Sequence, residues 1–296
     1  MKTVFITNAR AGRKRDQQLL HGLIEEHYGA DGRHFTIEPC SAKEQLDELI
    51  PAAIRNGVEL VFAVGGDGTV SEIGRRLIDT NLVLGILPVG SGNGLARHLG
   101  IPLNVTSALR ASLTGKVTRL DTATVNEHPF LGIAGVGFDA LVAERFAASK
   151  VRGLQTYVKE SLLSIGSYKA IGYDIVVDGR RLHTRAFLIT VANSNQYGND
   201  VKIAPLASLQ DGLLDVTVVG DAPLLSAPLI LGQLLLGQIQ DSSHVTSFRG
   251  KRVEIVRESA GPAHVDGEPI FLPEKLLFTI NPASLSVLVP RSMRKL

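Results

Sequence analysis

The sequence predicts an α/β N-terminal domain built on a parallel sheet, followed by a mainly antiparallel β-sandwich domain. Apolar runs typical of buried strands alternate with helix-patterned segments over the first third of the chain. Two glycine-rich loops each follow one of these runs. After Thr118, strand patterns dominate, with turn signals such as Asp178-Gly179. We therefore place the boundary near residue 120, with domains at 1–120 and 121–290.

The first domain should alternate strand and helix along the chain. We expect strands at residues 3–7, 35–38, 58–64 and 82–87, and helices at 14–28, 41–56 and 69–78. The helix at 69–78 places Val70, Ile73 and Leu77 at helical spacing. Such alternation implies a parallel sheet with helices on both faces.

The second domain should consist mainly of short strands. A hairpin of residues 171–177 and 184–191 is expected around Asp178-Gly179. Further strands are expected at 213–219, 253–256, 276–280 and 285–289, with helices at 154–168 and 224–238. Prolines and glutamines interrupt the apolar stretch 222–239, so we interpret it as an amphipathic or buried helix, not as a membrane span.

Composition narrows the class of protein. The chain has 296 residues, of which 44% are hydrophobic and 20% charged, as expected for a folded soluble protein. The net charge of +2 gives no sign of a nucleic-acid partner. The single cysteine, Cys40, excludes an internal disulfide and suits a reducing compartment. With no signal peptide pattern at the N-terminus, we expect a cytoplasmic protein.

The first glycine loop, Gly65-Gly66-Asp67-Gly68-Thr69, stands between a predicted strand and a predicted helix. Glycines let backbone amides approach a ligand, and amides at a helix N-terminus bind phosphate. Asp67 would repel phosphate unless a divalent cation lay between them, so the loop indicates a nucleotide–Mg²⁺ site. The alternative is a tight turn in which Asp67 caps the helix.

A second glycine loop strengthens the nucleotide interpretation. Ser91, Gly92 and Asn93 belong to the run Pro88-Val-Gly-Ser-Gly-Asn-Gly94, again between a strand and a short helix. Two such loops after neighbouring parallel strands would lie at the carboxyl edge of the sheet, where open α/β sheets bind ligands.

A late pair of carboxylates is the candidate acid–base group. Asp266 and Glu268 flank Gly267 after a strand-like run, and paired carboxylates can raise one pKa toward base function. The alternative is an ordinary Asp-Gly hairpin corner.

These three motifs, in this order, resemble the diacylglycerol kinase catalytic-domain superfamily, which includes bacterial soluble lipid kinases, sphingosine kinases and ceramide kinases. The resemblance covers nearly the whole chain. It implies a phosphofructokinase/NAD-kinase-like first domain, a C-terminal strand near 285–296 that returns to that domain, and an interdomain active site. It also implies an ATP-dependent kinase that uses Mg²⁺ and phosphorylates a lipid hydroxyl of a diacylglycerol-like acceptor.

The resemblance assigns roles to particular residues. Asp266 would be the catalytic base, with Glu268 and Asp121 as supporting acids; a salt bridge from Asp121 to Arg119 is the alternative for Asp121. The implied nucleotide contacts are Asn8, Cys40, Gly65, Gly66, Asp67, Gly68, Thr69, Ser71, Glu72, Ser91, Gly92 and Asn93.

A structural Mg²⁺ is also implied by the resemblance, apart from the metal at Asp67. Its ligands would be the Asp211 side chain and the backbone carbonyls of Ser208 and Leu213. A mixture of carboxylate and carbonyl oxygens suits a hard cation. The alternative is a plain turn.

Some positions depart from the family pattern, and they leave two rival functions open. Ser71 stands where the family usually has Asn, and Cys40 where it has a Thr that touches nucleotide. The first rival is an NAD kinase-like phosphotransferase; the second is a non-catalytic nucleotide-binding regulatory protein.

A lipid acceptor would be met at the membrane surface. The segment 142–168 combines apolar residues with Arg145, Lys150, Arg152 and Lys159. We expect it to give transient, peripheral contact with an anionic membrane; the alternative is a helix that covers the β-domain with solvated charges. A homodimer is left open by the sequence.

Overall fold

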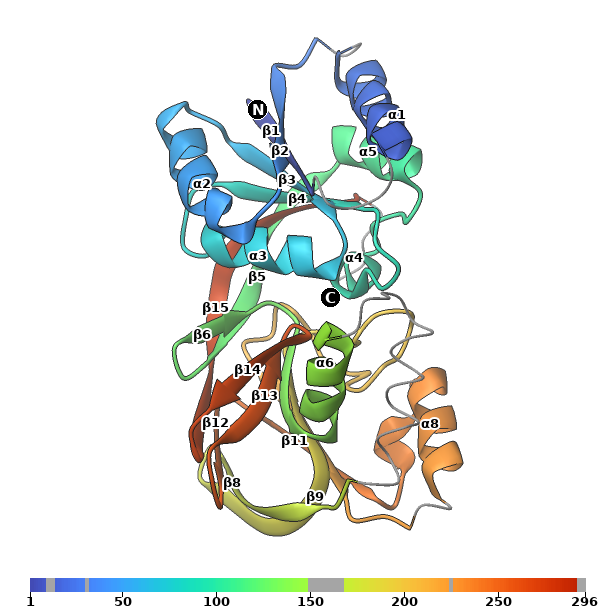
Figure 1. Cartoon of the computed structure of the whole chain (residues 1–296), viewed down its shortest axis with the longest axis vertical. Coiled ribbons are helices and arrows are strands. Elements are labelled where there is room, and N and C mark those ends of the chain that lie inside the picture. Colours follow the sequence, from blue (N-terminus) through green and yellow to red (C-terminus); the bar gives the residue numbers. More distant parts are fainter. Residues whose placement is uncertain (9–13, 30–31, 149–167, 224–225, 292–296) are drawn as a thin grey trace. The chain divides into compact units, whose positions relative to one another are not determined.

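The computed structural model describes residues 1–8, 14–29, 32–148, 168–223 and 226–291. The chain forms two compact units. Unit 1 comprises Met1–Leu120 and Ala283–Leu296, and unit 2 comprises Asp121–Pro282. The predicted fold class is confirmed, because the strands of unit 1 pair in parallel and the strand pairs within unit 2 are antiparallel (Figure 1).

Unit 1 is a parallel sheet in the order β2-β1-β3-β4, extended by the end of β15. Its strands are β1 Thr3–Asn8, β2 Phe35–Cys40, β3 Leu60–Gly65, β4 Val83–Pro88 and the last part of β15 Lys275–Val289. Every residue of β3 and β4 is buried, as in sheets covered on both faces. Ser286 and Val287 of β15 pair with β4, so the sequence's last strand belongs to this sheet.

Helices cover both faces of this sheet. They are α1 Lys14–Ile24, α2 Leu46–Arg55, α3 Asp67–Leu77, the short α4 Gly94–His98, and α5 Val105–Leu113. In Figure 1, α1 and α5 lie together on one side and α2 and α3 on the other, and each pair is in contact. The helix expected at 14–28 ends earlier than predicted, at Ile24, and continues as a π-helical turn over Glu25–Gly29.

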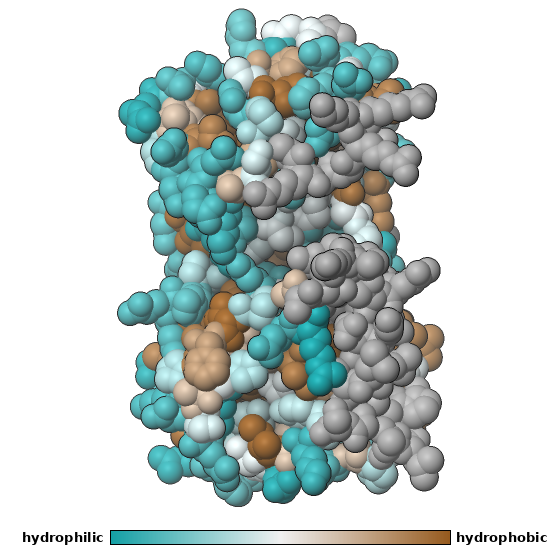
Figure 2. Space-filling view, in the orientation of Figure 1, coloured by the Kyte–Doolittle hydropathy of each residue, from teal (hydrophilic) through white to brown (hydrophobic). Residues whose placement is uncertain are grey.

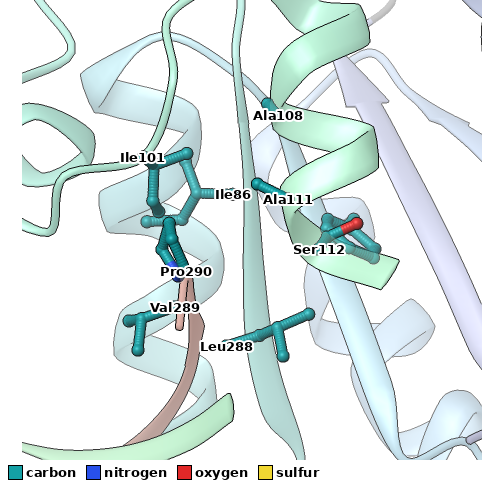
Figure 3. A pocket seen from close by; sticks show the side chains of 9 residues that line it. Ile86, Ile101, Ala108, Ala111, Ser112, Leu288, Val289 and Pro290 are labelled. Atoms are coloured by element: carbon teal, nitrogen blue, oxygen red, sulfur yellow. The ribbon is translucent and has the colours of Figure 1, made fainter. Parts of the chain in front are cut away.

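Aromatic side chains form the core of unit 1 around β1 and β3. Phe5 stacks on Phe62 with ring centroids 4.6 Å apart, and Tyr28 packs edge-on against Phe5 at 5.0 Å. A cavity of about 10 Å³ lies among apolar side chains such as Ile86, Ile101 and Leu288 (Figure 3). That is about the space one water molecule needs, so we interpret the cavity as a packing gap in the core.

The strand order of unit 1 creates a switch point. From β1 the chain adds β2 on one side and β3 on the other. In open α/β sheets, ligands bind outside the carboxyl ends of the strands at such a point. Here those ends are Asn8 of β1 and Gly65 of β3.

Unit 2 is built from antiparallel strands around one apolar core. Its strands are β6 His128–Phe130, β7 Ile133–Gly137, β8 Ile171–Val177, β9 Arg180–Ala192, β10 Leu214–Gly220, β11 Val245–Gly250, β12 Arg252–Arg257, β13 Gly261–Val265 and β14 Glu268–Leu272. β5 Lys116–Val125 and β15 each contribute to both units. Buried side chains including Phe130, Tyr173, Val191, Val216 and Phe278 form the core. The predicted hairpin is observed as β8 and β9.

Two α-helices of unit 2 fall in the described residues, α6 Phe138–Ala148 and α8 Ala227–Leu236, and a 3₁₀-helix follows at Ile239–Asp241. Helix α8 packs Ile230 and Leu234 against a second buried cluster that includes Ile203 and Ile239, and it exposes Leu229, Leu235 and Leu236. The helix expected at 224–238 is observed, but it is not amphipathic, because its exposed side is also apolar. Most of the helix expected at 154–168, and with it the expected membrane contact, lies outside the described residues.

No helix in the described part of the chain is long and apolar enough to cross a membrane. On the face shown in Figure 2, hydrophobic residues form small patches separated by hydrophilic ones.

Candidate active site

The switch point of unit 1 brings together several residues that the sequence singled out. Asn8 and Cys40 are register partners at the carboxyl ends of β1 and β2. The Asn8 side chain donates from Nδ2 to Thr69 Oγ1 at 3.3 Å, across the gap between β1 and the first glycine loop. The Cys40 thiol donates to the Ala42 carbonyl at 3.1 Å. Polar groups at the ends of β1 and β2 and in the first glycine loop therefore lie at the carboxyl edge of the sheet.

The two glycine loops touch through their backbones. A Cβ on Gly90 would lie 2.5 Å from the Cα of Gly66, and one on Gly66 would lie 3.2 Å from the Cα of Gly90. Val89 N also donates to the Gly65 carbonyl at 3.0 Å. These loops can approach this closely only because neither residue has a side chain.

Asp67 joins the two loops through its carboxylate. Oδ2 accepts from Asn93 N at 2.8 Å, and Oδ1 accepts from Gly94 N at 2.7 Å, at the start of α4. Asn93 has a left-handed backbone with φ of 53° and donates from Nδ2 to the Gly90 carbonyl at 2.7 Å. The Asp67 carboxylate therefore ties the first glycine loop to the second.

The first turn of α3 leaves room for a ligand at Gly68. This residue is exposed, and a Cβ added to it would meet nothing within 4 Å. Helix N-termini carry backbone donors and a positive partial charge, which favour phosphate. In the second loop, Ser91 is exposed, while the Gly92 carbonyl accepts from Arg97 Nε at 3.0 Å.

Two of the expected nucleotide contacts have other partners or are buried. Glu72 pairs with Arg76 at 2.7 Å and with Arg75 at 3.6 Å. Ser71 is 6% exposed on the buried side of α3. Nucleotide contacts at Ser71 and Glu72 stay predictions.

In unit 2, Asp266 occupies the corner of the β13–β14 hairpin. Asp266 and Gly267 have φ of 50° and 79°, the left-handed pair that a type I′ turn requires. The Asp266 carboxylate accepts three hydrogen bonds from the backbone at and just before the start of β7. Oδ1 accepts from Gly132 N at 2.8 Å and Ile133 N at 3.1 Å, and Oδ2 accepts from Leu131 N at 3.0 Å. The hairpin corner and the candidate base are thus the same residue. Glu268 begins β14, half-buried, as register partner of Val265.

Asp121 is held by a loop of unit 2. Its side chain is 5% exposed, and Oδ2 accepts from Gly212 N at 2.8 Å. Its own N–H donates to the Leu209 carbonyl at 2.7 Å. Arg119, the alternative partner suggested by the sequence, donates from Nε to the Ala283 carbonyl at 2.7 Å.

Asn193 connects the Asp121 segment to the Asp266 segment. Its fully buried Nδ2 donates to the carbonyls of Asp121 at 2.9 Å and Leu131 at 2.7 Å. The N–H groups of Asn193 and Ser194 both donate to the Gly132 carbonyl. Asn193 therefore satisfies backbone groups of the segment whose amides hold Asp266.

The expected metal ligand Asp211 contacts an arginine. Asp211 Oδ1 accepts from Leu213 N at 3.1 Å, and its Oδ2 pairs with the guanidinium of Arg249. Arg249 Nε also pairs with Asp215 Oδ1 at 3.1 Å. Burial raises the pKa of the Asp215 carboxyl, against the attraction of Arg249. A metal at Asp211 stays a prediction.

Sequence reasoning missed a buried polar cluster behind the Asp266 hairpin. His264 Nε2 lies 3.1 Å from Asp139 Oδ2, which also accepts from Tyr197 Oη at 3.1 Å and Thr190 Oγ1 at 3.2 Å. A Cβ on Gly135 would lie 2.4 Å from Asp139 Oδ2. No local sequence pattern indicates this cluster, because its members come from four separate elements.

The chain thus consists of an α/β unit with two glycine loops and a β unit that carries the candidate carboxylates. Residues 2–125 match the diacylglycerol kinase catalytic domain, and residues 132–289 match the YegS C-terminal NAD kinase beta sandwich-like domain. The chain belongs to the family of YegS-like lipid kinases and diacylglycerol kinases.

Similar proteins carry matching names. A "Probable lipid kinase YegS-like" from Chromohalobacter salexigens is 32% identical, with 97% of this chain and 93% of that protein covered. A "Diacylglycerol kinase" from Mycobacterium tuberculosis is 28% identical, with 98% and 96% covered. A solved structure of a diacylglycerol kinase from Bacillus anthracis has a TM-score of 0.80 at 20% identity, covering 99% of this chain and 98% of its own, and shows the shared fold.

Proposed function

We propose that this chain is an ATP-dependent lipid kinase that transfers the γ-phosphoryl group of ATP to the hydroxyl of a diacylglycerol-like lipid. The observation that carries the proposal is the pair of touching glycine loops, joined by Asp67 at the switch point of the sheet, in a chain of the lipid kinase family. The names of the relatives support a lipid acceptor.

Unit 1 would bind the nucleotide. Its phosphates would lie at the N-terminus of α3, over Gly66 and the exposed Gly68, with Ser91 and Asn93 contributing from the second loop. Asn8 and Cys40 stand at the neighbouring strand ends, where the nucleoside would extend.

Mg²⁺ fits the donor set of the first loop. A carboxylate oxygen can accept from more than one partner, and the Asp67 carboxylate would contact a phosphate-bound Mg²⁺ directly or through water. The metal, when bound, neutralises the charge that develops on the transferred phosphoryl group.

Unit 2 would supply the base. Asp266, kept in one orientation by three amide donors, would take the proton of the lipid hydroxyl, with Glu268 and Asp121 as supporting acids. Peripheral contact with an anionic membrane would bring the enzyme to its acceptor.

A phosphorylation assay tests this function. Purified protein would be incubated with γ-labelled ATP and Mg²⁺, with a panel of vesicle-borne lipids in some tubes and NAD in others. We expect label in a lipid. Label in NAD alone would favour the NAD kinase-like alternative, and no transfer to any acceptor would favour the non-catalytic one.

The nucleotide assignment has its own test at Gly68. Gly68→Val should abolish ATP binding, measured by calorimetry, because the side chain would fill the open space ahead of α3. The fold should survive, since nothing lies within 4 Å of the new Cβ. Gly22→Val is the matched control, because Gly22 is also an exposed helical glycine with open space around it. ATP binding by Gly68→Val equal to that of Gly22→Val would remove the nucleotide from this loop.

A further inference from the structure

Arg249 lies between two aspartates in unit 2. It stands on β11 directly opposite Asp215 of β10. Nε pairs with Asp215 Oδ1 at 3.1 Å, and Nη2 pairs with Asp211 Oδ2. Because the guanidinium is planar and has five N–H donors in a fixed arrangement, one arginine can bridge two carboxylates in a defined geometry.

The environment stabilises this arrangement. Asp215 is 8% exposed, so its charge needs a nearby cation. Burial lowers the pKa of Arg249, but the two aspartates together raise it by more, so the guanidinium stays charged. Arg249 thus acts as a permanent positive charge at the Asp211 loop.

The positive charge of Arg249 disfavours a divalent metal at the same place. Asp211 Oδ1 accepts from Leu213 N, and its Oδ2 pairs with Arg249, which is a cation. Asp215 Oδ1 pairs with the same guanidinium. The Asp67 carboxylate, in contrast, accepts from neutral backbone amides. A dication at Asp211 would face the positive charge of Arg249 at contact distance.

We propose that Arg249 is the built-in counter-ion of the loop at Asp211, in place of a divalent metal. The loop matters because its backbone on both sides of Asp211 holds Asp121. Gly212 N donates to Asp121 Oδ2, and the Leu209 carbonyl accepts from Asp121 N. Arg249 is therefore a positioning residue for Asp121.

The connection continues toward Asp266. Asn193 bridges the carbonyls of Asp121 and Leu131, and the amides of residues 131–133 hold the Asp266 carboxylate. Every step of this hydrogen-bonded chain lies in unit 2. Release of the Asp211 loop should thus loosen the catalytic carboxylates without touching the glycine loops.

Thermal unfolding without nucleotide tests the counter-ion. The wild-type midpoint should be the same in EDTA, in Mg²⁺ and in Ca²⁺. Arg249→Gln should lower it by about 3–6 °C, the scale of losing a partly buried charge pair in a chain of this size. Arg252→Gln is the control, because Arg252 pairs with Glu254 at an exposed position of the next strand and should shift the midpoint little.

The variant should also gain a response to metal. With the guanidinium removed, Asp211 and Asp215 are left facing each other's charge, so Ca²⁺ or Mg²⁺ should raise the midpoint of Arg249→Gln but not that of the wild type. A saturable rise of the wild-type midpoint with Mg²⁺, abolished by Asp211→Asn, would overturn the proposal. So would an Arg249→Gln midpoint equal to that of the wild type.

If Arg249→Gln does not fold, the wild-type metal titration alone still decides. The effect on catalysis rests on the proposed function: Arg249→Gln should lower kcat and leave the KM for ATP unchanged. A failed kinase assay would leave the unfolding and metal results standing, so the two failures are distinguishable.

Discussion

Two Asp-Gly turns of unit 2 have the same backbone and different surroundings. Asp178-Gly179 joins β8 to β9 with φ of 43° and 87°, and Asp266-Gly267 joins β13 to β14 with φ of 50° and 79°. Each aspartate donates its N–H to a carbonyl of another segment. The Asp178 carboxylate accepts from the backbone N–H groups of Lys251 and Arg252. The Asp266 carboxylate accepts from the backbone N–H groups of residues 131–133. The same arrangement, an aspartate at a hairpin turn whose carboxylate accepts backbone amides of another segment, therefore occurs twice in unit 2.

The difference lies in the further connections of the bound segment. The amides that hold Asp178 belong to the tight connection between β11 and β12, and Asp178 is exposed. The segment that holds Asp266 is tied by Asn193 to Asp121, and Glu268 follows Asp266 by two residues. Only the second turn is connected to segments that carry further candidate carboxylates, Asp121 and Glu268, so its connections, not its local geometry, make it the candidate base.

The largest expected effect is a difference in kcat between Asn variants of the two turns. Asp266→Asn should lower kcat about 100- to 10,000-fold, the usual scale for an acid–base group. Asp178→Asn should leave kcat unchanged. In each Asn variant, the side-chain NH₂ faces a backbone N–H, so that N–H loses its acceptor. Both variants should therefore lose about 1–3 kcal/mol of unfolding free energy. Measured by urea unfolding and steady-state kinetics, equal kcat values in the two variants would make Asp266 purely structural.

A second test loosens the Asp266 hairpin at its far end. Arg257, 7% exposed, donates to the carbonyls of Gly261, Pro262 and Leu272. Arg257→Met should cost about 2–4 kcal/mol of unfolding free energy, because buried carbonyls lose charged donors. Arg252→Met, at an exposed ion pair, should cost less than about 1 kcal/mol. If the two variants have the same urea midpoint of unfolding, Arg257 does not stabilise the hairpin.

The smallest effect comes from crowding Asp266 without removing it. A Cβ on Gly132 would lie 3.2 Å from Asp266 Oδ1, so Gly132→Ala should shift the carboxylate by a few tenths of an ångström. We expect kcat to fall about tenfold, since small displacements of a reacting group are costly. Gly172→Ala, where a Cβ meets nothing within 4 Å, is the control. Unchanged kcat in Gly132→Ala would show that catalysis tolerates a displacement of the Asp266 carboxylate by a few tenths of an ångström.

Local patterns were enough to predict the fold class and the motifs. The alternation of apolar runs and helical spacing predicted the parallel α/β unit, and Asp178-Gly179 predicted the hairpin. These features depend on residues close in sequence, so periodicity and turn chemistry suffice. The loop at Gly65–Thr69 was recognised for the same reason.

The partners of the site residues could not be predicted. The contact of Gly66 with Gly90, the bonds from Asp67 to Asn93 and Gly94, and the bonds from Asp266 to residues 131–133 join positions 24 to 135 residues apart. Arg249 gave no signal, because a lone arginine on a strand is typical of a solvated surface charge. Only the pairing of β10 with β11 places it against Asp215 and Asp211.

The sequence by itself determined the alternation of strand and helix in the first unit, the β8–β9 hairpin, the two glycine loops and the chemical types of the candidate residues. It did not predict α5, α6, β6, β7 or β11, and the strands expected at 276–280 and 285–289 are one strand, β15. The tertiary structure alone decided what each polar side chain contacts. Asp67 holds a loop, Asp211 meets an arginine, and Asp266 accepts three amides, because strands distant in sequence bring those donors to it. A buried polar group must be satisfied by whatever the fold places beside it, and that neighbour is fixed by topology, not by local sequence.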